Sequence, residues 1–274
     1  MAASSSAPAA RAFDRAPICR SSCVPFLAAA LLCGAAAASE AAEGSGPPRP
    51  PSVAADAGLP EPGWLEVETA LQHERAGRER RDSWPVKLKL AFSPDLGVEL
   101  GFDGALRLRD DAGASRRGFG DTSLVVKSRF ALDDAQAFGL EAGVNLPTAR
   151  RGLGSGSGKA DFSLKGIYSV EWSDWNVDLN VAGTRLGAVP EGTGRGEIGW
   201  AAALWRGLGD RWGIVGELSG TRQRGVRSEQ QFLLAVSRSV SPGLVLDVGA
   251  ARSLRSGSEW SAFIGFTWLA ARVY

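Results

Sequence analysis

From Trp64 to Tyr274 the chain repeats one pattern about a dozen times: some ten residues alternate between apolar and polar or small side chains, and a turn follows. Alternation with a period of two places one face of a β-strand against apolar surroundings and the other against water or a filled interior. A water-soluble β-sandwich would show a similar alternation. The strand number, the loop lengths and the aromatic residues instead favour an all-β fold of another kind, an antiparallel up-and-down transmembrane β-barrel.

The alternation predicts twelve strands. They are expected at 64–73, 84–92, 96–108, 121–132, 136–146, 160–172, 175–186, 196–205, 212–222, 229–239, 244–253 and 259–270. Short turns rich in Pro, Gly, Asp and Ser are predicted at 93–95, 133–135, 173–174, 207–211 and 241–243. Longer connections are predicted at 74–83, 109–120, 147–159, 187–195, 223–228 and 254–258. Because short and long connections alternate and the strand number is even, both ends of the barrel are expected at the short-turn, periplasmic rim.

Three hairpins give consistent registers when neighbouring strands are folded about their turns. Apolar residues then meet apolar residues on one side, and in two hairpins opposite charges meet on the other, as cross-strand pairing requires. The predicted pairs are Phe130 with Phe138, Val126 with Ala142, Lys127 with Glu141, Lys89 with Glu99, Leu88 with Leu100, Trp172 with Trp175 and Val170 with Val177. The final strand is expected to close the barrel against the strand that begins at Trp64.

The two faces of the predicted strands differ in composition. Most tryptophans share the apolar face and lie near strand ends, where membrane barrels carry aromatic girdles: Trp84, Trp172, Trp175, Trp200, Trp212, Trp260 and Trp268. The other face carries charges of both signs, which a dry core would not tolerate unpaired. The residues predicted to line the lumen are Lys87, Lys89, Glu99, Lys127, Arg129, Glu141, Asp161, Lys165, Glu217 and Asp247. They form either a solute path or a self-neutralising ladder, and the pairs Lys127–Glu141 and Lys89–Glu99 favour the ladder.

The N-terminal residues 1–38 are predicted to be a signal peptide. Basic residues at Arg11, Arg15 and Arg20 precede an apolar, alanine-rich run at 24–38, and small residues suited to cleavage follow. Cleavage after Ala38 or Ala42 fits this pattern, whereas the run is short for a membrane anchor. Residues 39–63 are rich in Pro and Gly and are predicted to be an extended periplasmic linker rather than a plug for the lumen. Residues 64–274 are then the barrel.

The composition excludes several kinds of chemistry. All three cysteines lie in the predicted signal, so the mature chain has no disulfide, thiol nucleophile or thiolate metal site. Removal of residues 1–38 takes away three basic residues and one acidic residue, which leaves 28 Lys and Arg against 29 Asp and Glu. No basic patch indicates nucleic acid. We predict no catalytic residue, no metal and no cofactor.

An outer-membrane hydrolase is the enzymatic alternative. It would use His73, the chain's single histidine, and would need a serine within hydrogen-bond reach. Ser83 is the nearest serine in sequence, but no motif marks it as a nucleophile. The sequence therefore favours a solvated rim position for His73 and a protein that is not an enzyme.

Arginines concentrate at the predicted long-loop rim: Arg78, Arg80, Arg81, Arg116, Arg117, Arg150, Arg151, Arg195, Arg222, Arg224, Arg227, Arg252 and Arg255. They serve either loop solubility or contact with the anionic groups of lipopolysaccharide, because clustered guanidinium groups bind phosphate.

Several local strings resemble one family. They are Gly118-Phe-Gly-Asp-Thr122, Lys127-Ser-Arg-Phe130, Gly143-Val-Asn-Leu-Pro-Thr148, the Gly-rich stretch 152–161 and Gly265-Phe-Thr-Trp268. Together they resemble outer-membrane barrel proteins of the MetA-pathway of phenol degradation family, with the likeness extending over roughly 64–270. The resemblance implies passage of hydrophobic or aromatic compounds and supplies no catalytic residue. Members end soon after the final aromatic run, whereas this chain continues to Tyr274, so either Trp268 or Tyr274 is the terminal aromatic for the barrel assembly machinery.

The sequence thus predicts a channel or transporter of the cell outer membrane for passive passage of small molecules, hydrophobic or aromatic ones among them. The alternative is a structural or adhesive barrel whose lumen is closed by its own charges. The expected partners are outer-membrane lipid, lipopolysaccharide, a small-molecule solute and the barrel assembly machinery, with no nucleic acid.

Overall fold

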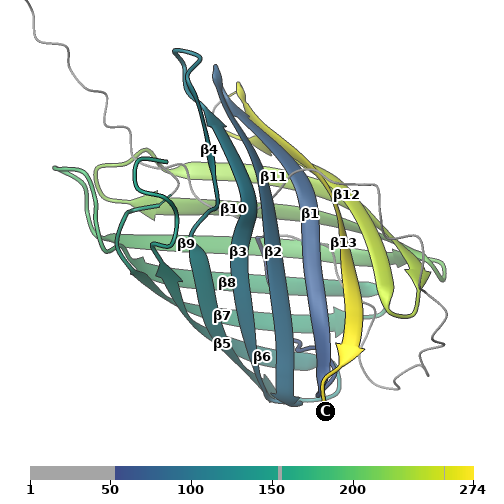
Figure 1. Cartoon of the computed structure of the whole chain (residues 1–274). Coiled ribbons are helices and arrows are strands. Elements are labelled where there is room, and N and C mark those ends of the chain that lie inside the picture. Colours follow the sequence, from purple (N-terminus) through teal and green to yellow (C-terminus); the bar gives the residue numbers. More distant parts are fainter. Residues whose placement is uncertain (1–52, 154–155, 256) are drawn as a thin grey trace, which may run out of the picture.

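A computed structural model describes residues 53–153, 156–255 and 257–274, which form a closed antiparallel barrel of twelve long strands with one short extra strand (Figure 1). The predicted signal peptide and part of the predicted linker lie outside the described residues. The strands are β1 (Trp64–Ala76), β2 (Glu79–Ser93), β3 (Leu96–Arg109), β4 (Ser115–Gly118), β5 (Thr122–Ala131), β6 (Gln136–Leu146), β7 (Asp161–Trp172), β8 (Trp175–Arg185), β9 (Gly196–Leu208), β10 (Trp212–Gln223), β11 (Glu229–Ser241), β12 (Leu244–Ser253) and β13 (Glu259–Arg272). No helix in the described part of the chain is long and apolar enough to cross a membrane.

Each long strand pairs with the next one along the chain, and β13 returns to β1. The closing register runs from Trp64 opposite Arg272 to Ala76 opposite Glu259. The prediction that the final strand pairs with the strand at Trp64 is confirmed. Closure leaves no free edge among the twelve strands, so backbone donors and acceptors are satisfied within the wall, as a hydrocarbon environment requires.

The three predicted hairpin registers are confirmed. The structure sets Lys127 opposite Glu141 and Phe130 opposite Phe138, and the rings of the two phenylalanines lie 6.2 Å apart. It also sets Lys89 opposite Glu99 and Trp172 opposite Trp175. These registers follow from the turns and the alternation, because a slip of one residue would move every apolar side chain to the other face.

The first predicted loop is wrong. In place of a long connection at 74–83, β1 continues to Ala76 and β2 begins at Glu79, so a two-residue turn joins them. Gly77 in this turn has a φ of +64°, a conformation that glycine adopts without strain. The strand prediction missed these residues because charged side chains interrupt the apolar alternation where the hairpin extends beyond the apolar part of the wall.

The extra strand β4 was also not predicted. It lies within the predicted loop 109–120 and pairs with the end of β3, from Leu106 opposite Gly118 to Arg109 opposite Ser115. The next strand, β5, takes over the same edge of β3 further down, starting at Phe102 opposite Thr122. Residues 119–121, between the two pairings, are in neither strand. They belong to the string Gly118-Phe-Gly-Asp-Thr122, one of those that resemble the family.

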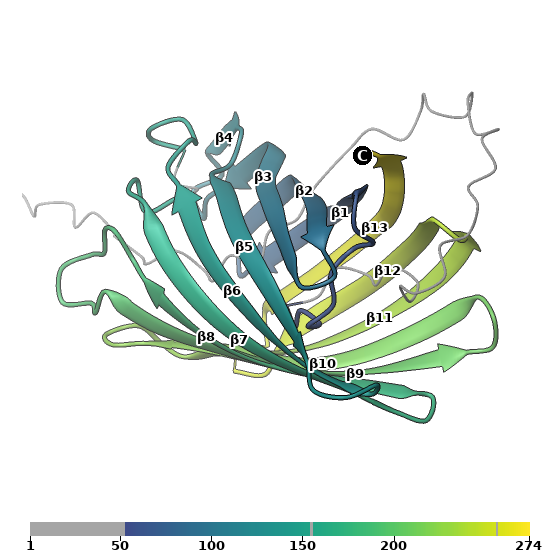
Figure 2. The same cartoon turned by 90° about the horizontal axis from the view of Figure 1, so that it is seen from below.

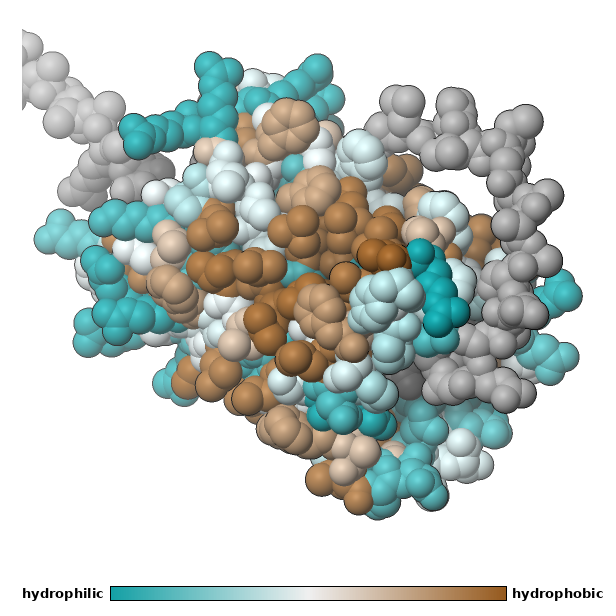
Figure 3. Space-filling view, turned by 60° about the horizontal axis from the view of Figure 1, so that its bottom comes forward, coloured by the Kyte–Doolittle hydropathy of each residue, from teal (hydrophilic) through white to brown (hydrophobic). Residues whose placement is uncertain are grey.

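The outer face of the barrel is apolar. Leu, Val, Ile and Phe side chains on this face are exposed, and Figure 3 shows them as a brown band flanked by hydrophilic residues. Six of the seven tryptophans predicted to face outward are exposed: Trp84, Trp172, Trp200, Trp212, Trp260 and Trp268. The seventh, Trp175, is partly buried, with the guanidinium of Arg206 4.8 Å from its ring centroid. An apolar belt with aromatic residues on its surface is the arrangement that a bilayer requires.

The residues before β1 run inside the barrel, where Figure 2 shows the dark-blue start of the described chain within the ring of strands. Ala54 and Ala57 in this segment are 4% and 0% exposed. The expectation that nothing in the predicted linker packs, and that it does not plug the lumen, is wrong for residues 53–59. The contacts that hold the segment use its backbone groups, which no side-chain pattern reveals.

Candidate functional site

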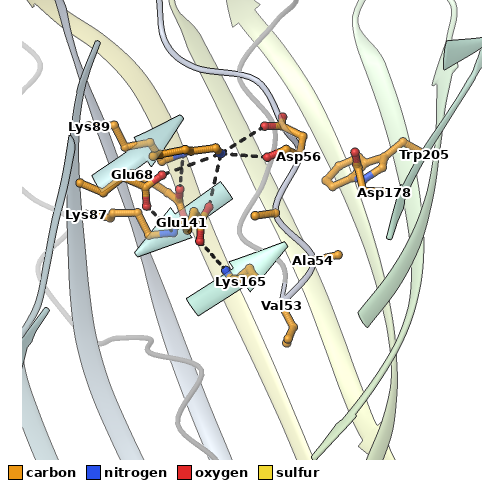
Figure 4. Close-up of a pocket in the computed structure, with 13 residues that line it drawn as sticks. Val53, Ala54, Asp56, Glu68, Lys87, Lys89, Glu141, Lys165, Asp178 and Trp205 are labelled. Carbon is orange, nitrogen blue, oxygen red and sulfur yellow. Dashed lines mark hydrogen bonds and ion pairs between the residues drawn. The ribbon is translucent and has the colours of Figure 1, made fainter. Parts of the chain in front are cut away.

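A ladder of charged side chains covers the lumenal wall of strands β1 to β3 (Figure 4). Lys89 Nζ lies 2.8 Å from Glu66 Oε1 and 2.7 Å from Glu68 Oε2. Lys87 Nζ lies 3.7 Å from Glu68 Oε1 and 3.9 Å from Glu99 Oε2. Lys87 therefore has carboxylates on both neighbouring strands, and Lys89 has two on β1. The inward position of these side chains follows from their shared parity along the strands.

The ladder continues across β5, β6 and β7. Lys127 Nζ lies 3.5 Å from Glu141 Oε1 and 4.0 Å from Glu99 Oε1, and Lys165 Nζ lies 2.8 Å from Glu141 Oε2. The Lys127 and Glu141 side chains are only 5% and 7% exposed. Buried charges of this kind persist only when they are paired, because an unpaired charge would pay the full cost of leaving water.

One predicted ion pair is corrected. Lys89 and Glu99 are opposite each other in register, but Lys89 pairs with Glu66 and Glu68, while Glu99 pairs with Lys87 and Lys127. Lys89 also lies opposite Glu66 on its other neighbouring strand, and that carboxylate is at hydrogen-bond distance. The sequence reasoning omitted Glu66 and Glu68, although their alternation with Val67 and Thr69 was the signal that could have identified them.

The inner segment is held by hydrogen bonds from several strands. The Ala54 amide donates to Glu217 Oε2 at 2.9 Å, and the Ala57 amide donates to Ser169 Oγ at 2.8 Å. Ala55 donates to Asn180 Oδ1 and accepts from Asn180 Nδ2, both at 2.8 Å. These contacts span β7, β8 and β10, so the segment crosses the lumen rather than lying along one strand.

The segment also reaches the charged ladder. Lys127 Nζ donates to the Asp56 carbonyl at 2.8 Å and lies 3.8 Å from the Asp56 carboxylate (Figure 4). Asp56, Ser169 and Asn180 were not among the sequence-predicted lumen residues. No composition or spacing signal distinguishes them from other polar residues, because their role depends on where the segment crosses.

The lumenal wall of β9 to β13 is largely apolar, although it also carries the buried carboxylates of Glu217 and Asp247. It is built from small or aliphatic side chains and two aromatic rings that are 1–7% exposed, with Ala54 packed among them: Ala201, Ala203, Trp205, Val215, Leu233, Ala235, Ala251 and Phe263. The lumen therefore has one charged side and one apolar side. The sequence predicted the charged side but not the apolar side, because alanines that alternate with charged residues on the inner face give no clear apolar pattern.

The remaining predicted lumen residues occupy different places. Glu217 is 1% exposed and holds the inner segment, and Asp247 is 3% exposed on the apolar wall. Arg129 is partly buried near the short turn before β3, where its backbone amide donates to Asp95 O. Asp161 lies at the long-loop rim and accepts from Ser157 Oγ and the Gly187 amide, so it fixes loops.

Six of the ten predicted residues line one cavity within the barrel: Lys87, Lys89, Glu99, Lys127, Glu141 and Lys165. Residues 53–56, Glu68, Asp178 and Trp205 complete its lining. The cavity holds about 90 Å³ with the inner segment in place. This volume is well below the roughly 300–1,000 Å³ of pockets that bind drug-sized ligands. In this conformation the site admits a few water molecules.

His73 has an acidic partner. Its Nδ1 lies 2.7 Å from Asp82 Oδ1, and its ring lies 5.3 Å from the ring of Trp260. Ser83 follows Asp82 and pairs with Gln72, so it points to the inner face, whereas His73 points outward. Ser83, the serine nearest to His73 in sequence, is therefore on the opposite side of the wall from the His73 ring.

Comparison with known proteins places the barrel in a family. The model of the family described as "Putative MetA-pathway of phenol degradation" matches residues 92–259, more than half of the chain. The chain belongs to this family. The phenol-degradation family match spans β3 to β12 almost completely and includes the ladder residues Glu99, Lys127, Glu141 and Lys165. No curated protein sequence matches the chain.

Solved structures share the fold. An outer membrane channel from Pseudomonas putida F1 is 15% identical with a TM-score of 0.60, covering 78% of this chain and 97% of its own. The NanC porin is 8% identical with a TM-score of 0.56, covering 74% and 98%, and the KdgM porin is 12% identical with a TM-score of 0.52, covering 74% and 99%. These likenesses show that the barrel fold is shared, and the apolar belt shows that the outer face of this barrel suits a bilayer.

Proposed function

We propose that this barrel is a channel of the outer membrane that lets small molecules, hydrophobic or aromatic ones among them, pass through its lumen by diffusion. The observation that supports this most is the lumen itself, which joins a charged wall to an apolar one inside a closed lipid-facing barrel. A structural barrel whose lumen is closed by its own charges would need no apolar inner wall. The family description, with its reference to phenol degradation, favours solutes of aromatic character.

Both chain ends of the barrel lie at the rim that carries all of its short turns except the one at 77–78. This rim faces the periplasm when the long loops face outward. Solute would then enter between the long loops and leave beside β1 and β13. The test is to reconstitute the mature protein in planar bilayers and liposomes and to measure conductance and osmotic swelling. Discrete current steps and solute uptake support the proposal, whereas a sealed bilayer with no uptake contradicts it.

A structural or adhesive barrel with a closed lumen is the second candidate. The small cavity and the neutralised ladder favour it, because the cavity of about 90 Å³ is bordered by charges that pair with one another. The same reconstitution distinguishes the two, since a closed barrel stays silent under every voltage and every solute. We propose no reaction for either candidate.

Contacts with lipopolysaccharide and with the barrel assembly machinery also belong to this proposal. Arginines at the long-loop rim support the first, but Arg81 does not take part. It points inward, with Nη2 2.8 Å from Asp103 Oδ2, and its side chain is 15% exposed. For the second, Trp268 is 46% and Tyr274 is 60% exposed, and the hydroxyl of Tyr274 donates to Ala91 O, so both aromatic residues are accessible to the assembly machinery.

A further inference from the structure

We propose that residues 53–59, called here the lumenal plug, are displaceable and occupy the solute site of the channel. We further propose that this site is fitted to small neutral molecules that combine an apolar body with hydroxyl, carbonyl or amide groups. The inference rests on the proposed channel function and names both its gate and its solute class.

The hydrogen bonds between plug and wall use neutral groups of the plug, and one ion pair accompanies them, with the Asp56 carboxylate 3.8 Å from Lys127 Nζ. Every hydrogen bond described between plug and wall uses a peptide N–H or C=O of the plug: the amides of Ala54, Ala55 and Ala57, and the carbonyls of Ala55 and Asp56. The wall therefore presents acceptors at Glu217, Asn180 and Ser169 and donors at Lys127 and Asn180. A solute that replaces the plug meets the same donors and acceptors, and hydroxyl, carbonyl and amide groups satisfy them as the peptide does.

The lysines beside the site keep carboxylate partners on the wall when the plug leaves and takes the Asp56 carboxylate with it. Lys127 has Glu141 at 3.5 Å and Glu99 at 4.0 Å, and Lys165 has Glu141 at 2.8 Å. A charged solute would add an ion to a buried and nearly balanced ladder, and it would pay desolvation without a free counter-charge. Neutral solutes avoid this cost. The ladder therefore does not attract organic ions to this binding site.

Apolar side chains complete the site. Ala54 packs with the apolar wall that includes Ala203 and Trp205, and Ala57 packs with Ala137 and Ile167. The side chains of the plug are small at these positions, so the space that its atoms fill could hold the carbon skeleton of a small solute. A molecule with an apolar body would regain the apolar contacts that the plug loses when it leaves.

The attachment of the plug allows it to move. Pro60 and Pro62 have no amide hydrogen and cannot join a strand ladder, and regular contact with the wall resumes where the Gly63 amide donates to Ala91 O at 3.0 Å. Gly63 has a φ of +83°, and a Cβ there would lie 2.7 Å from Tyr274 O, so glycine is required at this turn. The stretch 60–62 is therefore a hinge between the wall and the plug.

The chain offers a direct test because its three cysteines, Cys19, Cys23 and Cys33, all lie in the predicted signal. A Cβ built at Gly139 lies 3.3 Å from the Ala57 Cβ, close to the roughly 3.5–4.5 Å of disulfides. The double variant Ala57→Cys/Gly139→Cys should therefore form a disulfide that locks the plug. The measurement is potassium chloride conductance in planar bilayers before and after reduction, with each single-cysteine variant as a matched control and gel mobility without heating as the check of folding.

The proposal expects the oxidised double variant to be silent and reduction to restore conductance to the level of the single variants. Failure of the two cysteines to cross-link in the folded barrel overturns the position of the plug. Equal conductance in both redox states overturns the gate while leaving the channel function intact. Silence of the parent protein and of every variant in both states refutes the channel function, and the gate with it.

The solute class is tested by competition in detergent. Benzyl alcohol, benzoate and benzylammonium share one ring and differ in charge. Each is added while the rate of disulfide formation in the reduced double variant is followed, because a bound solute keeps the plug out. We expect benzyl alcohol to slow cross-linking at concentrations about tenfold lower than either ion requires. Equal effects of all three, or a stronger effect of an ion, would overturn the assignment to neutral solutes.

Discussion

Asn180 and Ala55 bind each other in both directions: the Ala55 amide donates to Asn180 Oδ1 and Asn180 Nδ2 donates to the Ala55 carbonyl, both at 2.8 Å. One side chain thus holds an extended backbone as a neighbouring strand would. Asn180 is 5% exposed, so both bonds are shielded from competing water. This pair is the most specific contact between the wall and the lumenal plug.

Replacing Asn180 by leucine is expected to loosen the plug. The change removes two hydrogen bonds, each with a net value of about 0.5–1.5 kcal/mol, and leaves the Ala55 peptide group without those partners. The open fraction in single-channel recordings should rise severalfold. Asn176→Leu is the matched control, because Asn176 lies on the same strand and face and makes no hydrogen bond with the plug among the described residues. A recording of Asn180→Leu that matches the parent would contradict the role of this pair.

Removal of Glu141 should be costly because it serves two lysines. Glu141→Leu leaves Lys127 buried with only the more distant Glu99 and Asp56 carboxylates, at 4.0 and 3.8 Å. Breaking a buried pair from one side typically costs about 3–5 kcal/mol, and we expect a loss of this order in the free energy of unfolding by urea.

The double change Glu141→Leu/Lys127→Leu serves as the comparison, since it removes the stranded charge and should recover part of the loss. Lys159→Ala, at an exposed loop position, should change the stability little. If the double variant is less stable than Glu141→Leu alone, the ladder is not held by this pairing.

Most of the barrel follows from local sequence. Turn residues and the alternation of side chains fixed the register of the hairpin that joins β5 and β6, because both act over neighbouring residues. The hairpin of β1 and β2 was underestimated where Glu79, Arg80 and Arg81 replace apolar residues. Outside the bilayer a strand needs no apolar face, so the signal disappears while the pairing continues.

The site was only half predictable. The alternation of side chains identifies the charged residues of the inner face, and six of the residues predicted in this way line the cavity. The plug could not be predicted from the sequence, because Ala54, Ala55 and Ala57 contribute backbone groups and small side chains that any linker could carry. The partners Ser169 and Asn180 are equally ordinary in sequence. Their role depends on the path of a segment about 110 to 125 residues away.

Close approach of the plug to β6 depends on Gly139. A Cβ at this position would lie 3.2 Å from the Ala57 Cα and from the Ile167 Cβ, so the larger side chain of Gly139→Val should push the plug away. The expected result is faster reaction of a cysteine at position 57 with a water-soluble thiol reagent, by about tenfold or more. Gly183→Val is the control, since nothing lies within 4 Å of a Cβ there. Unchanged reactivity in Gly139→Val would contradict the packing.

Charge on the outer face should destabilise the barrel in lipid. Val181, in the middle of β8, is 64% exposed on the apolar belt. Val181→Arg is expected to cost about 2–4 kcal/mol for folding into bilayers, the range known for arginine at the bilayer midplane, whereas Val181→Leu should be near neutral. A negligible cost for Val181→Arg would mean that this face does not contact lipid.

The central claim, that solute passes through the lumen, is tested most directly by two adjacent positions on opposite faces of β7. Lys165 faces the lumen, where it pairs with Glu141, and Leu164 is 54% exposed on the lipid side. The measurement is the single-channel current of Lys165→Cys and Leu164→Cys before and after addition of a charged, membrane-impermeant thiol reagent. A lumenal path predicts that the current changes in Lys165→Cys and stays constant in Leu164→Cys. A current that is unaffected at 165, or equally affected at both positions, would contradict it.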